Sequence, residues 1–241
     1  MNTLKELQNH IEKFNKENNT KLSIDSIRIE FRKEHKLKKI KELGKWNRLK
    51  KNSNILHKLK NRLAIDEVTS AYQLDNHNIY FYNSNKDKPK YRIAEIVIFG
   101  MKQYHKEPPP YYLIETIVNI ITYKNSKIKI NIDVCNDSSI KPNINALEVF
   151  FDIKQYRHKN GLLTDTFYLN DTYTKEIEKV CIYNKALKND LKTPLWRIEA
   201  KIHILDIKVL NLPLIDFKEL LDTAKVLNIE QTIKRQDNGK I

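Results

Sequence analysis

Glycine is scarce in this chain, whose 241 residues contain only four. Phosphate-binding loops and dinucleotide fingerprints need several closely spaced glycines, because the backbone must approach the phosphate. Isolated glycines cannot form either motif, which excludes the usual nucleotide-binding loops. Four glycines and seven prolines also argue against a low-complexity or loop-rich chain.

The cysteines and histidines do not indicate a metal site either. Cys135 and Cys181 each lie in an apolar run without metal-binding spacing, which predicts reduced, buried thiols and a cytosolic compartment. The seven histidines form no His-x-His or His-x-x-x-His pair. No G-x-S-x-G motif or other serine or cysteine nucleophile context is present. Most familiar enzyme classes are therefore excluded.

Long apolar runs are also missing. No stretch approaches the roughly 18 apolar residues that span a bilayer, and the residues after Met1 are polar rather than signal-peptide-like. We therefore expect a cytoplasmic protein without a membrane partner. A hydrophobic content of 40%, including 12 Tyr, 8 Phe and 2 Trp, nevertheless predicts a folded core rather than wholesale disorder.

Positive charge is abundant: Lys and Arg number 44 against 30 Asp and Glu, a net charge of +14. This balance favours a polyanionic partner, above all nucleic acid, because phosphate neutralisation releases counterions. An acidic membrane surface, or charge that only maintains solubility, are the alternatives. The excess is greatest near the N-terminus, where a basic insert at 32–62 is predicted to contact DNA through Lys38, Lys39, Lys41, Lys45, Trp46, Arg48, Lys50 and Lys51.

Hydrophobic periodicity predicts an α+β fold. Helices are expected at 3–18, 36–51 and 55–63 with a break at Gly44, at 111–123 after three prolines, and at 216–227. Strands are expected at 21–31, 78–83, 91–100, 127–137, 165–171, 178–185 and 195–207. Residues 140–158 fit either a helix around 145–151 or a strand.

We expect these elements to form a mostly antiparallel curved sheet from two strand–helix units, with helices on one face. The predicted organisation is an N-terminal helix (1–20), a main domain (21–215) and a C-terminal helix with a polar tail (216–241). The main domain has halves at about 21–126 and 127–215, and the basic helical insert lies in the first half.

Three strands carry polar side chains opposite an apolar face. In strand 195–207, alternation places Arg197 and Glu199 on the side away from Trp196. The other polar residues predicted on such faces are Lys201, His203, Cys181, Tyr183, Lys185, Asp133 and Asp137. If the strands are neighbours, these residues share one surface. An ordinary solvated sheet face with a few ion pairs explains the same alternation.

Three segments, in order, resemble the rolling-circle replication initiators of the Rep_trans type found in plasmids and phages. EIVIFGMKQYHK from Glu95 resembles their E-L-S-G-Q-G-C-R-like strand and loop, and KIKINIDVCND, 127–137, resembles their R-I-D strand. CIYNKALKNDLKTPLWRIEAK, 181–201, resembles their Y-x-K motif followed by W-x-R-x-E. The chain departs from the pattern where Asn131 replaces the arginine of R-I-D, where Gly100-Met101-Lys102 replaces Gly-Cys-Arg, and where Trp196 and Arg197 are adjacent.

The resemblance implies a DNA nickase in which Tyr183 is the nucleophile that forms a phosphotyrosine. It implies that Asp133 and Glu199, with Asp137 or Glu95 as a further carboxylate, bind Mg²⁺ or Mn²⁺ or act as bases. Lys185 or Arg197 would hold the phosphate. Tyr111 and Tyr112 are the next candidate nucleophiles.

The function expected from the resemblance is initiation of rolling-circle replication at a plasmid or phage origin. The implied partners are origin DNA, a host helicase and a polymerase, and the protein itself could form a homodimer. Two alternatives remain open at this point. One is a nucleic-acid-binding protein without catalysis, and the other is a structural or interaction protein of a mobile element.

Overall fold

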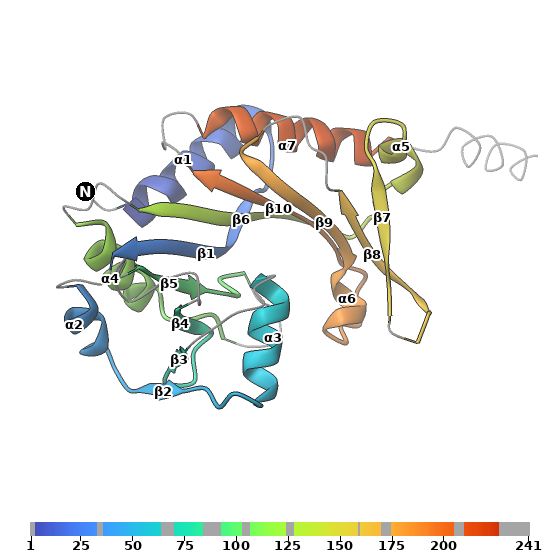
Figure 1. Cartoon of the computed structure of the whole chain (residues 1–241). Helices are drawn as coiled ribbons and strands as arrows, with labels where there is room; N and C mark the ends of the chain where they lie inside the picture. Colours follow the sequence, from blue (N-terminus) through green and yellow to red (C-terminus); the bar gives the residue numbers. More distant parts are fainter. Residues whose placement is uncertain are drawn as a thin grey trace, which may run out of the picture. The chain divides into compact units, whose positions relative to one another are not determined.

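The computed structural model describes residues 3–32, 36–63, 70–83, 93–102, 107–123, 128–158, 160–169, 175–204 and 210–226. The chain divides into two compact units. Unit 1 comprises Met1–Lys13, Ile24–Asp133 and His203–Ile207, and unit 2 comprises Phe14–Ser23, Val134–Ile202 and Lys208–Ile241. Both combine helices with antiparallel strands, which confirms the predicted α+β class (Figure 1). The expected polar tail, 228–241, and the ends of several expected strands (91–92, 127, 170–171 and 205–207) lie outside the described residues.

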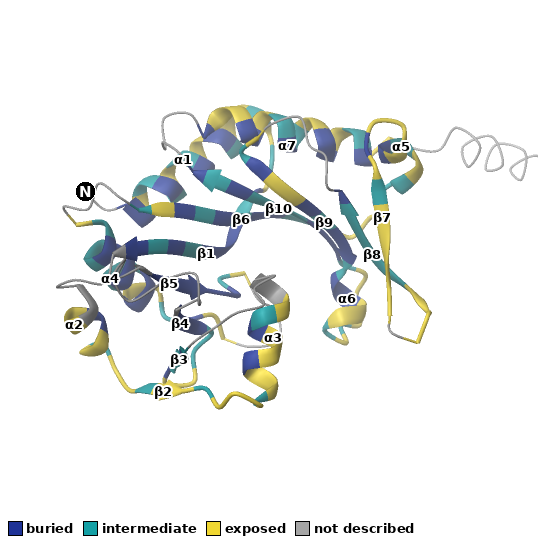
Figure 2. Ribbon diagram, viewed as in Figure 1, coloured by how far each residue is buried: buried dark blue, intermediate teal, exposed yellow. Residues whose placement is uncertain are grey.

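Unit 1 contains a sheet whose strands follow a hydrogen-bonded order different from their order in the chain. The order is β2 (Trp46–Arg48), β3 (Ser70–Leu74), β4 (Ile79–Asn83), β5 (Ile93–Ile98), β1 (Ser23–Arg32) and the start of β6 (Lys129–Ser138). The pairs from β2 to β1 are antiparallel. Strand β5 is buried from Ala94 to Ile98 on both of its faces (Figure 2). A carboxylate on this strand must therefore find its partners inside the protein.

Helices of unit 1 follow the predicted periodicity. Helix α1 (Thr3–Asn18), which belongs to unit 1 as far as Lys13, has the predicted bounds and buries Leu4, Leu7 and Ile11. Helix α4 (Tyr111–Thr122) begins directly after Pro110 and buries its apolar side. Helix α3 (Asn54–Leu63) inserts Leu56 and Leu59 into a core cluster completed by Ala71, Tyr80, Tyr82, Val97 and Phe99.

The predicted helix 36–51 is wrong in its second half. Helix α2 ends at Lys41, and the residues Trp46–Arg48 form strand β2. Pairing with β3, which was not predicted at all, overrides the helical propensity of this lysine-rich segment. The predicted break at Gly44 is confirmed: a Cβ atom there would lie 2.7 Å from Asp75 Oδ2 and 3.0 Å from Leu74 Cδ1.

Unit 2 contains the other strands, again in an order that differs from the sequence. After the end of β6 come β10 (Trp196–Ile204), β9 (Ile177–Asn184), β8 (Leu163–Leu169) and β7 (Ile153–Arg157). The pairs from β10 to β7 are antiparallel. Strands β6 and β10 contribute residues to both units.

The ambiguous segment 140–158 contains both predicted alternatives, helix α5 (Ile144–Glu148) and strand β7. Asn143 caps α5 by accepting a hydrogen bond from the Ala146 amide, and its own side-chain amide donates to the Val226 carbonyl 2.8 Å away. The second bond ties α5 to the end of α7 (Asn211–Ala224), which lies along one face of the unit 2 strands (Figure 1). Helix α7 starts five residues before its predicted position and buries Leu214 and Phe217.

Candidate active site

Strands β9 and β10 divide their side chains as the alternation predicts. Ile198 and Ala200 are buried on the apolar face. The antiparallel register places Arg197 opposite Tyr183 and Glu199 opposite Cys181, so these four side chains lie on the other face. The predicted neighbourhood of Tyr183, Arg197 and Glu199 is thus present within unit 2.

The Tyr183 hydroxyl donates a hydrogen bond to Glu199 Oε2 across a distance of 3.2 Å. Tyr183 is only 7% exposed, and the Glu199 side chain is 20% exposed. A carboxylate in this position can accept the phenol proton, and its partial exposure leaves a route for that proton to solvent. The pair therefore has the geometry of a nucleophile with its base.

A second carboxylate, Asp137, is held by Arg197 on the same face. Arg197 donates from Nε to Asp137 Oδ1 at 2.6 Å and from Nη2 to Oδ2 at 2.8 Å, a two-pronged ion pair. Arg197 is fully buried, and its Nη1 lies 3.9 Å from Glu199 Oε2. The guanidinium therefore positions both carboxylates, which suits it to organising the site rather than contacting a phosphate.

Lys188 is a site residue that the sequence reasoning missed. Its Nζ lies 4.5 Å from the centre of the Tyr183 ring, and the residue is exposed. It reaches this position because β9 ends at Asn184, whose side chain accepts a hydrogen bond from the Leu187 amide and starts the short helix α6 (Lys185–Lys188). The N-cap residue Asn184 immediately after a strand was the available signal.

The predicted placement of Lys185 on the strand face is wrong by one residue. Because β9 ends at Asn184, Lys185 is the first residue of α6 and is 7% exposed. Burial makes Lys185 a poorer candidate for direct phosphate contact than Lys188.

Cys181 lies beside Glu199 on the same face but is no competing nucleophile. Burial, followed by the nearby Glu199 charge, raises the pKa of its thiol to about 12. A thiol with this pKa stays protonated at neutral pH, and the thiolate is the reactive form.

Two other predicted carboxylates have their partners in unit 1. Ser26 donates its hydroxyl to Asp133 Oδ2. Glu95 Oε2 accepts from Arg28 Nε at 2.5 Å and from the Tyr82 hydroxyl at 2.6 Å. This oxygen of Glu95 is thus already bound by two donors.

The predicted metal ligands do not form a ready metal site. Both oxygens of Asp137 are engaged by Arg197, and Asp133 and Glu199 each accept a hydroxyl. Over the described ranges, no group of three or more His, Cys, Asp or Glu side chains is placed to hold a metal ion. The carboxylates supply the oxygen ligands that Mg²⁺ or Mn²⁺ prefers, but the described side chains are not grouped around one point, so metal binding stays a prediction.

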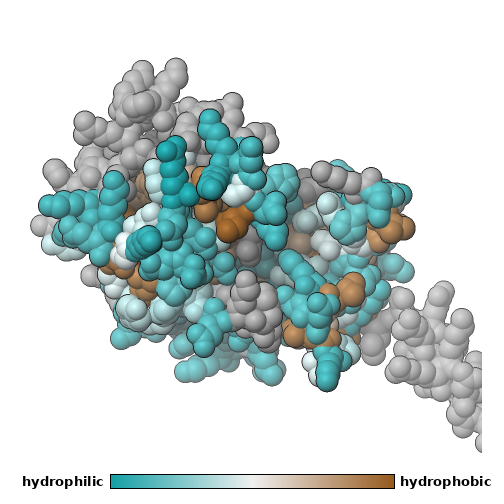
Figure 3. Space-filling model, turned by 90° about the horizontal axis from the view of Figure 1, so that it is seen from below, coloured by the Kyte–Doolittle hydropathy of each residue, from teal (hydrophilic) through white to brown (hydrophobic). Residues whose placement is uncertain are grey.

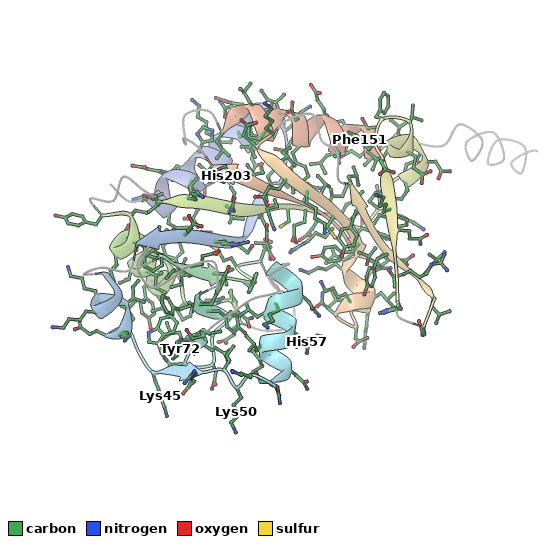
Figure 4. The ribbon with its side chains drawn as sticks, viewed as in Figure 1. Lys45, Lys50, His57, Tyr72, Phe151 and His203 are labelled. Atoms are coloured by element: carbon green, nitrogen blue, oxygen red, sulfur yellow. The ribbon has the colours of Figure 1, made fainter. Side chains whose placement is uncertain are left out.

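The predicted DNA-binding residues lie in unit 1, on α2, β2 and the turns beside them. All of the predicted cations are exposed, namely Lys38, Lys39, Lys41, Lys45, Arg48, Lys50 and Lys51. Lys45 and Lys50 point away from the backbone (Figure 4), and much of the described surface facing the viewer in Figure 3 is hydrophilic. Trp46 differs, because its indole N–H donates to the Ile40 carbonyl at 3.0 Å and its ring meets Phe81 edge-on. Trp46 therefore holds β2 to α2 and to Phe81 of β4.

In the part of the chain that the structure covers, no helix combines the length and the apolarity required to span a bilayer.

Comparison with known proteins gives one solved structure to report. No protein-family description matches the chain, and no curated protein matches it. The chain is similar in fold to a rolling circle replication initiator protein from Geobacillus stearothermophilus, at 15% sequence identity and a TM-score of 0.46. The match covers 76% of this chain and 74% of the other.

Proposed function

We propose that this protein nicks one DNA strand at a replication origin and thereby starts rolling-circle replication. The observation that supports this most directly is the hydrogen bond from the Tyr183 hydroxyl to Glu199. In the proposed step the phenol oxygen attacks the phosphorus of a phosphodiester, and Glu199 takes the phenol proton. The bond from phosphorus to the 3′ oxygen breaks, and that oxygen takes a proton from solvent, which leaves a 5′-phosphotyrosine and a free 3′ hydroxyl for a polymerase.

Glu199 suits the role of base because it is not the carboxylate that Arg197 binds with two hydrogen bonds. Asp137 takes that bond, so Glu199 keeps oxygen capacity for the Tyr183 proton. The 3.2 Å separation lies at the upper end of the range for proton transfer through a hydrogen bond. Arg197 is a positioning residue in this scheme, since it contacts carboxylates rather than the reacting atoms.

Lys188 is the cation best placed to bind the phosphate that Tyr183 attacks. Its ammonium group lies over the Tyr183 ring and can move toward an incoming phosphate as a flexible point charge. Because Tyr183 is nearly buried, we expect DNA binding to draw Lys188 off the ring and open the hydroxyl. Lys185 remains the second candidate for this phosphate contact.

No step of this proposal passes through a metal ion, because the described His, Cys, Asp and Glu side chains are not grouped to hold one. A requirement for Mg²⁺ or Mn²⁺ stays a separate prediction, tested by adding EDTA. The exposed cations of unit 1 would hold duplex DNA by its phosphates, which positions the strand without reading its sequence. A host helicase and a polymerase would then act on the nicked origin.

The experiment compares wild-type protein, Tyr183→Phe and Tyr112→Phe on supercoiled DNA that carries the protein's own origin. Each is incubated with Mn²⁺, with Mg²⁺ or with EDTA, and a denaturing gel separates nicked DNA and covalent adducts. We expect nicking and an adduct that Tyr183→Phe abolishes and Tyr112→Phe keeps, since Tyr112 is 69% exposed and lies on α4. Nicking that survives in Tyr183→Phe would refute the assignment.

A non-catalytic DNA-binding protein is the second candidate, and the burial of Tyr183 favours it. Such a protein would bind DNA equally well in EDTA and in the Tyr183→Phe variant. Its affinity would fall steeply with salt, because the exposed lysines contact phosphates. DNA binding with no nicking under any metal condition would select this candidate.

A further inference from the structure

Three tyrosines lie on one face of neighbouring strands in unit 2. Tyr183 on β9 is opposite Thr166 on β8, and Tyr168 is two residues farther along β8. Tyr183 and Tyr168 are therefore diagonal neighbours, roughly 7–8 Å apart in their backbones. On the edge strand β7, Lys154 is opposite Tyr168 and Tyr156 follows two residues later, so this strand continues the same face.

Tyr183, Tyr168 and Tyr156 form a row across the three strands, and the rings at its β7 end contact one another. The Tyr156 and Tyr168 rings meet edge to face with centres 6.3 Å apart, and the His158 ring lies 5.6 Å from Tyr156. Tyr156 is 44% exposed, although an aromatic ring gains most by burial. It sits where the β7–β8 register shifts between Gln155 and Arg157, and such an irregularity redirects a side chain.

Lysines accompany each part of the row. Lys188 Nζ lies over the Tyr183 ring, and Lys179 Nζ lies 3.9 Å from the centre of the Tyr168 ring. Exposed Lys154 adds a third cation, 3.5 Å from the Asp152 carboxylate, which is also exposed. Burial, followed by the neighbouring Cys181, raises the pKa of Tyr168 to about 12, so its hydroxyl stays neutral beside Glu199 and adds no negative charge to the face.

We infer that Tyr168, Tyr156, Lys179 and Lys154 form a binding track for single-stranded DNA that continues from the phosphate attacked by Tyr183. The bases stack on the exposed ring of Tyr156, and the lysines contact the backbone phosphates. The inference rests on the proposed function, because that function places a DNA strand at Tyr183. It adds to that function the face of the unit 2 strands along which the DNA strand runs and the residues that hold the DNA.

Stacking requires bases that are not already paired, which favours a single strand over a duplex. Alternating rings and cations are the arrangement by which proteins hold single strands without reading their sequence. Edge strands also carry charges that prevent pairing with other chains, and Lys154 serves that purpose equally well. That purpose gives no reason for an exposed Tyr156 beside Tyr168 and His158.

Binding of a fluorescein-labelled, 12-nucleotide oligo(dT) measured by anisotropy tests the inference. All proteins carry Tyr183→Phe, so cleavage does not contribute, and a labelled duplex and oligo(rU) are measured in parallel. We expect Tyr156→Ala to weaken oligo(dT) binding about ten-fold, Tyr156→Phe to retain it, and the duplex affinity to change less than about two-fold. The matched control is Tyr112→Ala, which deletes an exposed tyrosine of unit 1 and should bind like the parent.

A second variant keeps the test independent of any folding defect. Lys154→Gln should lower the salt dependence of oligo(dT) binding by about 0.7 in the slope of log affinity against log salt, the value for one phosphate contact. Unchanged oligo(dT) affinity in Tyr156→Ala, an equal loss on duplex, or tighter binding of oligo(rU) than oligo(dT) would overturn the track. The nicking assay tests the proposed function separately, because it reports Tyr183 chemistry and not affinity for oligo(dT).

Discussion

Each unit of this protein contains an arginine, a glutamate and a tyrosine in contact, and the two sets differ in how the carboxylate is shared. In unit 1, Arg28 and Tyr82 both donate to the same oxygen of Glu95. In unit 2, Arg197 uses two of its nitrogens on Asp137, which leaves Glu199 to accept from Tyr183.

Under the proposed function, this difference separates a structural network in unit 1 from a reactive one in unit 2. Burial and the Glu95 charge raise the pKa of Tyr82, which is fully buried, so its phenol stays protonated. The Tyr183 site has a second carboxylate, a partly exposed Glu199 and a lysine over the ring. The same residue types share one acceptor in unit 1, whereas in unit 2 a separate acceptor is left for Tyr183, which is the feature that the proposed nucleophile and base require.

The largest expected effect comes from removing the base. Glu199→Gln keeps the size of the side chain but cannot take the Tyr183 proton, so we expect nicking to slow by about 10²–10⁴-fold. The measurement is the single-turnover nicking rate on origin DNA. Glu95→Gln is the counterpart in unit 1 and should leave the rate of folded protein within about two-fold, because Glu95 contacts Arg28 and Tyr82. Equal losses in both variants would remove the distinction between the two sets.

The next largest effect is on stability, and it compares the buried Arg197 with the partly exposed Arg28. Arg197→Leu leaves Asp137 without its buried partner and should cost about 3–5 kcal/mol of unfolding free energy. Arg28→Leu should cost about half as much, since the Arg28 side chain is 24% exposed and water can replace part of its contact.

Urea unfolding can follow each unit through its own tryptophan. Trp46 lies in unit 1 and Trp196 in unit 2, and the chain has no others. Proteins with Trp196→Phe or Trp46→Phe therefore report one unit at a time. A larger loss for Arg28→Leu than for Arg197→Leu would contradict the ranking by burial.

A smaller effect separates the two tyrosines. Tyr82→Phe removes a donor from Glu95 in a closed interior and should cost about 2 kcal/mol. Tyr183→Phe should cost about 1 kcal/mol or less, because Glu199 is partly exposed and can be hydrated instead. Thermal unfolding of both variants beside wild type is the measurement. A Tyr183→Phe variant as unstable as Tyr82→Phe would mark Tyr183 as structural, and would weaken the nickase proposal.

The sequence predicted the fold where periodicity was strong. The stripe of α1 and the alternation of β10 were read correctly because each pattern repeats over many residues. Strands β2 and β3 were misread or missed, since β2 has three residues and takes its conformation from pairing with β3. Local propensity carries no information on such pairing.

The candidate site was predicted in part for a related reason. Alternation placed Tyr183, Arg197 and Glu199 on one face, but it could not show that Arg197 binds Asp137 with two hydrogen bonds. Nor could it place Lys188, which reaches the ring only because α6 turns the chain after Asn184. Hydrogen-bond partners depend on side-chain geometry, and no sequence period records it.

The smallest expected effect comes from an exposed ion pair that serves as a reference for the two buried ones. Lys218 donates to Asp222 four residues later on α7, and this bond is the main reason that the pKa of Asp222 lies below its usual value of 3.8. A lowered carboxylate pKa stabilises the folded state above about pH 4, and the contribution is lost as the pH falls below that value. Since the Asp222 side chain is 47% exposed, Asp222→Asn should cost only about 0.3–0.5 kcal/mol at pH 7 and nothing at pH 2. Urea unfolding at pH 7 with low and high salt checks this value, because salt should abolish the effect of Asp222→Asn and leave most of the Arg197→Leu loss in place.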